Sequence, residues 1–277
     1  MSDLRFSGAI SSPWLQILKG VRKPAIESQN ISAEWHNIPL IGLEAYQRIC
    51  GFEVNPEGPW PISYPQVLLT PLHMQLIAQP SFPFPGLGLV HVRQVCEQYQ
   101  PIVSPKNCIA MVRTDNYQMR KKGAEIDIIS ELYDDDVLIW SAVTTVFSRK
   151  AKGHGQNETR PKIPNATDQA HSETWSLSSD LGRRYTKVSG DFNPIHLYAW
   201  SAKLFGFKKA IIHGMWSMAH ALSKLPPHPA KVTVHFIRPV ELPSQPKFVW
   251  DKIDSQEHFW IHHSHSDKVC LWGNITF

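Results

Sequence analysis

The residues best able to do chemistry stand close together, where Asp191 and His196 are five positions apart. Asn193 is a favourable N-cap, Pro194 suits the first helical position and Gly206 is a natural helix end, so we predict a capped helix of about 12 residues. Asp191 and His196 would then share its N-terminal end, where the helix dipole favours an ionised carboxylate and a neutral imidazole. Two such groups converging on one spot can hold a water molecule and move its protons.

A plainer explanation covers part of this pattern. A helix start accounts for Asn193, Pro194 and Gly206 without any chemistry. It does not account for the Ser-Gly-Asp run at 189–191 or for His196. The acid–base interpretation and the structural one both remain open on the local sequence alone.

A buried helix and alternating strands follow this motif, and a similar series occurs in the first half of the chain. Each half has an apolar stretch of helical length and then β-type runs, the last of which places Trp and Thr at matching offsets. The paired stretches are residues 72–78 and 215–222, 89–95 and 231–237, and 137–144 and 269–276. This order predicts an α+β fold that arose by duplication. Because residues 215–222 are apolar nearly all round, we expect a sheet wrapped around that helix.

The two halves are separated by a polar segment. Residues 148–164 are basic, contain several Gly and Pro, and show no periodicity. We therefore predict a first lobe at 1–147, a linker at 148–173 and a second lobe at 174–277. The chain of 277 residues is long enough for two compact domains of roughly 130 residues.

The composition excludes several classes of protein. With 42% apolar and 19% charged residues the chain is not of the disordered type. A net charge of only +4 does not suit nucleic-acid binding but suits an anionic small molecule. Four widely spaced cysteines and no secretory segment predict a cytoplasmic location. We expect no membrane span, because no apolar run approaches the roughly 20 residues that one requires.

A known family shares this pattern. The signature of the MaoC-like dehydratases, the (R)-specific enoyl-CoA hydratases, resembles a set of residues in the second half: Tyr185, Val188, Ser189-Gly190-Asp191, Asn193-Pro194-Ile195-His196, Ser201-Ala202 and Ile211–Met215. The resemblance covers about residues 175–277. The first half is similar only through the repeat, as in double hot-dog members whose other half has lost the catalytic pair. The resemblance implies a double hot-dog fold, with antiparallel sheets each wrapped around a central helix.

The resemblance also implies roles for individual residues. In the family, the Asp and His of the signature activate water for addition to an enoyl thioester, which places Asp191 and His196 in acid–base roles. The backbone N–H of Gly214, at the start of the central helix, takes the oxyanion role. A helix N-terminus offers a free donor and a favourable dipole, and glycine lets the thioester approach closely. His213 either orients this turn or only packs.

Four further residues are candidates for binding substrate: Asn193, Lys208, Lys209 and Trp216. Lys208 and Lys209, like Lys203, either contact the phosphates of coenzyme A or an acidic carrier protein, or are ordinary solubilising residues. Trp216 either shortens the acyl tunnel or packs in the core. We expect no metal and no cofactor.

The first half should lack a second active site. Pro71 aligns with Gly214, and proline has no N–H to donate. The segment Glu53-Val-Asn55-Pro56 has neither the preceding aspartate nor the following histidine. One active site, in the second half, is therefore predicted.

These observations predict a cytoplasmic lyase of fatty acid metabolism. It would interconvert a 2-enoyl thioester and an (R)-3-hydroxyacyl thioester, carried on coenzyme A or acyl carrier protein, and a homodimer is compatible with the sequence. Two alternatives remain. A hot-dog thioesterase would attack the carbonyl carbon instead of C3, and a silent acyl-thioester-binding protein would need no proton-transfer pair.

Overall fold

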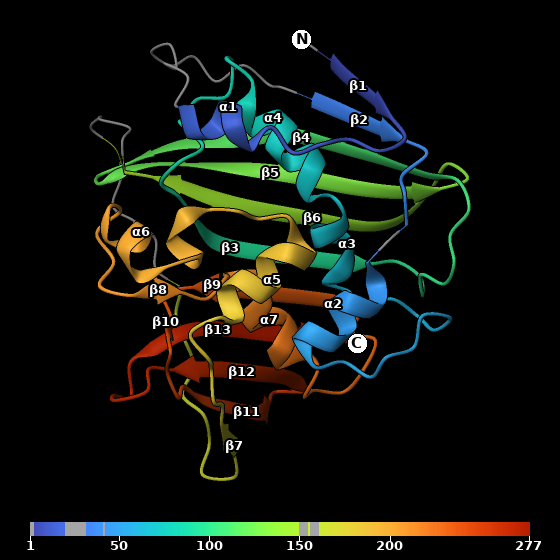
Figure 1. Cartoon of the computed structure of the whole chain (residues 1–277). Coiled ribbons are helices and arrows are strands. Elements are labelled where there is room, and N and C mark those ends of the chain that lie inside the picture. The colour runs from blue at the N-terminus through green and yellow to red at the C-terminus, as the bar shows by residue number, and fades with distance from the viewer. Residues whose placement is uncertain (1–2, 20–31, 41, 150–154, 156–160) are drawn as a thin grey trace. The chain divides into compact units, whose positions relative to one another are not determined.

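The computed structural model describes residues 3–19, 32–40, 42–149, 155 and 161–277 (Figure 1). The chain divides into two compact units, one formed by residues 1–41 and 64–160 and the other by residues 42–63 and 161–277. Residues 42–63 thus cluster with the second half, which differs from the predicted first lobe at 1–147. Of the predicted linker, residues 150–154 and 156–160 lie outside the described residues. The remaining lobe boundaries stay a prediction.

The first unit is a curved sheet with helices packed on it. Its strands are β1 (Asp3–Ser7), β2 (Ser32–His36), β3 (Leu89–Gln98), β4 (Cys108–Arg120), β5 (Gly123–Asp134) and β6 (Val137–Ser148). They lie in the order β1-β2-β4-β5-β6-β3, antiparallel except for the parallel pair β1 and β2. Its helices are α1 (Trp14–Lys19), α3 (Tyr64–Leu68) and α4 (Thr70–Ala78).

The central helix of this unit is α4, which covers the predicted stretch 72–78. Leu72 and Leu76 are fully buried. His73 joins the helix to the sheet, because its Nε2 lies 2.8 Å from the hydroxyl of Ser130 on β5. A buried apolar helix against an antiparallel sheet is the arrangement that the sequence predicted.

The buried His73 should make the first unit sensitive to acid. Burial, with the nearby His91, lowers the pKa of His73 from 6.5 to about 4. Between pH 6.5 and 4, His73 is therefore protonated in the unfolded chain but neutral in the folded chain. The free energy of unfolding is highest above pH 6.5 and decreases as the pH falls towards 4. His73→Gln keeps a hydrogen-bond donor for Ser130 but cannot be protonated. We therefore expect the slope of unfolding free energy against pH to be smaller in this variant by about 1 kcal/mol per pH unit between pH 4 and 6.5. Denaturant titrations at several pH values measure this slope, and identical slopes in both proteins would contradict the prediction.

The second unit has the same plan. Its main strands are β7 (His171–Thr174), β9 (Lys231–Phe236), β11 (Lys247–Ile253), β12 (Gln256–His262) and β13 (Val269–Thr276). They lie in the antiparallel order β9-β13-β12-β11-β7, and the short strands β8 (Ala210–Ile211) and β10 (Glu241–Leu242) form a separate pair. Its helices are α2 (Leu43–Cys50), α5 (Leu181–Ser189), the 3₁₀ helix η1 (Pro194–His196), α6 (Ala199–Lys203) and α7 (Gly214–Leu222).

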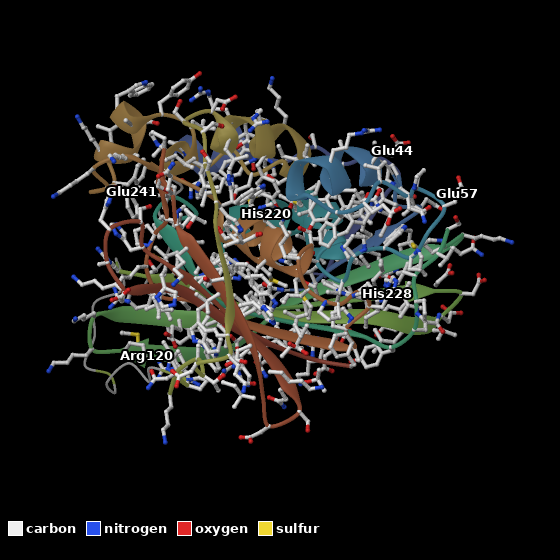
Figure 2. The ribbon with its side chains drawn as sticks, turned by 90° about the horizontal axis from the view of Figure 1, so that it is seen from below. Glu44, Glu57, Arg120, His220, His228 and Glu241 are labelled. Carbon is white, nitrogen blue, oxygen red and sulfur yellow. The ribbon has the colours of Figure 1, made fainter. Side chains whose placement is uncertain are left out.

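The central helix α7 is attached to α2 by two side chains. The indole N–H of Trp216 donates to the carbonyl of Ile49, and Nδ1 of His220 lies 2.8 Å from the carbonyl of Cys50. Figure 2 shows His220 beside the blue ribbon of α2. Gly51, which follows α2, has a φ of 84°, and a Cβ there would lie only 2.9 Å from His220. These bonds to carbonyls at the end of α2 explain why residues 42–63 belong to the second unit.

Both units repeat one order of elements, which supports the predicted duplication. In the first unit β2, β4, β5, β6 and β3 are neighbours in turn, and in the second unit β7, β11, β12, β13 and β9 follow the same order. The helices α2 and α5 also correspond, since each ends at a glycine of positive φ, Gly51 and Gly190, five residues after a buried tyrosine. The predicted α+β double hot-dog class is confirmed.

Two further predictions concern the chain as a whole. Within the described residues, no helix is long and apolar enough to cross a membrane. The four cysteines are all buried and none forms a disulfide.

Candidate active site

The candidate catalytic motif begins where α5 ends. Gly190 closes this helix with a φ of 70°, and the carboxylate of Asp191 accepts a hydrogen bond of 3.0 Å from the backbone N–H of Asn193. The side chain of Asn193 in turn accepts from the N–H of Ile195 and caps η1. The predicted N-cap at Asn193 is therefore confirmed, with Pro194 in the first turn as expected.

The predicted single helix of about 12 residues is wrong. The 3₁₀ helix ends at His196, and the separate helix α6 begins at Ala199 after an extended residue, Tyr198. Side chains stabilise this break. The hydroxyl of Ser201 donates to the carbonyls of Pro194 and Tyr198, at 2.7 and 3.0 Å.

The C-terminal end of α6 is as predicted. The N–H of Gly206 donates to the carbonyl of Lys203, and the N–H of Phe207 donates to the carbonyl of Ala202. Gly206 has a φ of 86°. These two bonds and the left-handed glycine form a Schellman ending.

Three polar side chains converge beyond α5: Asp191, His196 and His213. The imidazoles of His196 and His213 stack with ring centres 3.7 Å apart. His213 Nε2 lies 3.1 Å from the backbone carbonyl of Asp191 and 3.9 Å from its carboxylate. One nitrogen or oxygen of each side chain lies within 4.8 Å of those of the other two, close enough for one water molecule to bridge them.

The hydrogen bond of His196 determines which of its nitrogens can act as a base. Nδ1 lies 2.8 Å from the carbonyl of Ile211, so the neutral ring carries its proton on Nδ1 and a lone pair on Nε2. Burial lowers the pKa of His196, an effect that the nearby Asp191 carboxylate opposes. The sequence predicts a neutral imidazole from the helix dipole. Because η1 has only three residues, burial is the better explanation.

His213 is the site residue that the sequence left undecided. Burial and the neighbouring His196 hold the pKa of His213 well below its usual value, so the stacked pair stays neutral. Its Nδ1 and the hydroxyl of Tyr185 are buried, and neither has a hydrogen-bond partner among the described residues. The Tyr185 ring lies edge-on to His213 at 4.9 Å. The signal in the sequence was the position of His213 directly before Gly214.

A glycine on α5 lets the helix pack directly against the turn that carries Asp191 and His196. A Cβ on Gly182 would overlap the backbone carbonyl of His196. We therefore expect Gly182→Ala to displace His196, lowering both kcat and the unfolding midpoint, with a stability loss of about 1–3 kcal/mol. Gly206→Ala, where no atom lies within 4 Å but φ is positive, is the matched control and should lower stability alone. Unchanged kcat in Gly182→Ala would contradict this role.

Gly214 is the first residue of the central helix α7 and directly follows His213 of the histidine pair. The first helical bond of α7 runs from Ser217 N–H to the His213 carbonyl, so the N–H of Gly214 has no acceptor within the helix. A Cβ on Gly214 would lie 2.8 Å from the ring of Phe236 on β9. In the first unit, Pro71 lies in the first turn of α4 but is the second residue of that helix, whereas Gly214 is the first residue of α7. Thr70 therefore takes the position of Gly214, and the predicted alignment of Pro71 with Gly214 is wrong by one residue.

Of the other four candidates, only Asn193 bonds members of the cluster among the described residues, through its backbone. Trp216 is buried and lines a pocket of about 370 Å³, whose lining includes neither Asp191 nor His196. Lys209 pairs with Glu241 at 3.5 Å, and Lys208 is exposed. Asn193 serves as a helix cap. Their roles in substrate binding stay predictions.

Comparisons with known proteins agree with the motif. The MaoC like domain family matches residues 162–269. The chain is 28% identical over 231 residues to 3-hydroxyacyl-thioester dehydratase X of Mycobacterium tuberculosis, covering 80% of each protein. It is also 28% identical to the peroxisomal enoyl-CoA hydratase 2 of Arabidopsis thaliana, over 53% of this chain and 52% of that protein.

The fold has solved relatives as well. The crystal structure of the M. tuberculosis protein HtdX matches with a TM-score of 0.73 and 25% identity, covering 90% of this chain and 99% of that one. The resemblance of the chain to the MaoC-like family is thereby confirmed over residues 162–269.

Proposed function

We propose that this protein is a hydro-lyase that interconverts 2-enoyl and (R)-3-hydroxyacyl thioesters. The main support is that Asp191 converges with His196, whose Nε2 is free to accept a proton. Both residues lie within the segment that matches the MaoC like domain family. The dehydratase and hydratase names of the relatives support the same reaction.

In hydration, Nε2 of His196 takes a proton from a water molecule held between it and Asp191. The water oxygen bonds to C3 of the enoyl group, and the electron pair of the double bond moves onto the thioester oxygen as an enolate. The N–H of Gly214 stabilises this oxygen. The imidazolium, which the Asp191 carboxylate stabilises, then returns its proton to C2, and dehydration follows the reverse path.

The activity test separates this reaction from its alternatives. With crotonyl-CoA as substrate, we expect loss of enoyl absorbance without release of free thiol. Thiol release would support the thioesterase, which attacks the carbonyl carbon. Ligand binding without turnover, across enoyl chain lengths, would support a silent acyl-binding protein.

Removal of metal ions should not change the activity. The donor atoms of Asp191, His196 and His213 lie close enough to hold a divalent cation, yet the proposed steps need only proton transfer and a backbone donor. We expect full turnover after dialysis against a chelator. Loss of turnover that zinc restores would show that the cluster is a metal site.

Several finer features belong to the proposal. We place the enzyme in fatty acid metabolism in the cytoplasm, a location that four buried, unpaired cysteines support. We expect an acyl-CoA or acyl carrier protein thioester as substrate and no nucleic acid as partner, and a homodimer is compatible with the sequence.

A further inference from the structure

Exposed apolar side chains gather next to the catalytic turn. Tyr198, Trp200 and Leu204 are 46%, 68% and 76% exposed, and the rings of Tyr198 and Trp200 stack on each other. We call these three residues, with Lys203 between them, the α6 surface. Large exposed side chains that cluster in this way typically mark an interaction site.

The segment that contains this surface also holds the positive charge of the protein. Residues 180–210 include six Lys or Arg and two Asp, which equals the net charge of +4 of the whole chain. Lys203 and Lys208 are exposed, and no carboxylate of a described residue forms an ion pair with either. The positive and negative charges of the other residues therefore cancel. An acidic partner would be attracted to residues 180–210.

The α6 surface is tied directly to the catalytic turn. Tyr198 follows His196 by two residues, and Ser201 bonds the carbonyl of Pro194 in η1. The guanidinium of Arg183 on α5 lies over the Tyr198 ring and donates to the carbonyl of Leu197. A partner seated here would thus be held beside Asp191 and His196.

We propose that the α6 surface docks an acidic acyl carrier protein that delivers the enoyl thioester, an inference that rests on the proposed function. A nucleotide is usually held in a concave pocket, and the α6 surface does not line the pocket of about 370 Å³. Three large apolar side chains with adjacent cations instead fit an acidic helix that carries its own apolar residues. The position beside the catalytic turn favours a substrate carrier over a membrane, because a carrier must present its thioester there.

The test presents one acyl group in three forms: crotonyl-pantetheine, crotonyl-CoA and a crotonylated type II acyl carrier protein. We expect Trp200→Ser and Lys203→Glu each to lower kcat/KM about tenfold with the carrier substrate, as expected for the loss of an anchoring aromatic or of a charge pair. Turnover of the other two substrates should change less than about twofold. Lys252→Glu, the same charge change at an exposed position on β11, is the control and should leave all three unchanged.

Direct titration of the protein with labelled holo-carrier adds a readout that does not depend on turnover. Wild-type protein should bind and both variants should bind about tenfold more weakly, with binding weakened by salt. Absence of binding would overturn the docking proposal, and absence of turnover on all three substrates would instead overturn the proposed function.

Other results would assign the surface to a different occupant and contradict the proposal. A loss confined to crotonyl-CoA would indicate a nucleotide site. A change of mass on sedimentation in the variants would indicate a contact between copies. The wild-type protein could also bind anionic vesicles that the two variants do not bind. If the variants then turn over the carrier substrate as the wild type does, the α6 surface binds a membrane.

Discussion

Replacing Asp191 by asparagine should lower kcat for crotonyl-CoA hydration by about 10²–10⁴-fold, the range expected for loss of a positioned acid–base group. Asparagine keeps the oxygen that accepts from the N–H of Asn193, so the turn between α5 and η1 should survive. It cannot stabilise an imidazolium at His196. Steady-state kinetics measure the loss, and an unchanged unfolding midpoint shows that the fold is kept.

The partner residue should behave in the same way. His196→Asn retains a side-chain N–H for the carbonyl of Ile211 but has no base, so we expect a similar loss of kcat. Asp180→Asn is the matched control, because this carboxylate stands at the start of α5, where it pairs with Arg184. Its kcat should stay within about twofold of wild type. Wild-type kcat in either catalytic variant would contradict the assignment.

Two substitutions of Gly214 can distinguish the effect of its backbone N–H from the effect of its missing side chain. Gly214→Pro removes the N–H, and Gly214→Ala keeps it, while both introduce a Cβ that meets the ring of Phe236. Proline is suited to this position, since it is the first residue of α7 and the preceding His213 has a φ of −60° and a ψ of 134°. We expect kcat of the proline variant to fall about 10²–10³-fold below that of the alanine variant.

Thermal unfolding controls for the crowding that the two substitutions share. Similar midpoints with very different kcat values would identify the N–H as the cause. Equal kcat in the two variants would mean that the enolate oxygen is stabilised elsewhere. Pro71 at the start of α4 shows that this fold accepts proline in the first turn of its central helix.

Local signals in the sequence predicted the parts of the site that depend on neighbouring residues. The cap at Asn193, the Schellman ending at Gly206 and the start of α7 at Gly214 each follow from the conformational preferences of one or two residues. The order of helix and strands in each half was also visible, because burial on one face leaves a period in the sequence.

Features that depend on distant residues could not be predicted in this way. The break before α6 requires the Ser201 hydroxyl and Arg183 to bond carbonyls that a continuous helix would have used. The placement of residues 42–63 depends on the bond between Trp216 and Ile49, which are 167 positions apart. The neutral state of His196 depends on burial, which the dipole argument did not include.

His213 shows the same limit at the site itself. Its contribution comes from stacking on His196 and bonding the carbonyl of Asp191, and neither contact leaves a pattern in the sequence. The correspondence of α2 with α5 leaves a weak trace in the sequence. A tyrosine stands five residues before the closing glycine in both, Tyr46 before Gly51 and Tyr185 before Gly190.

The most direct test of the account is a double-mutant cycle on crotonyl-CoA hydration. If Asp191 and His196 handle one water molecule together, the double variant Asp191→Asn, His196→Asn should lose about as much kcat as either single variant, because groups acting as a unit are not additive. If instead the two losses multiply, the side chains act independently, and the shared-water mechanism is contradicted.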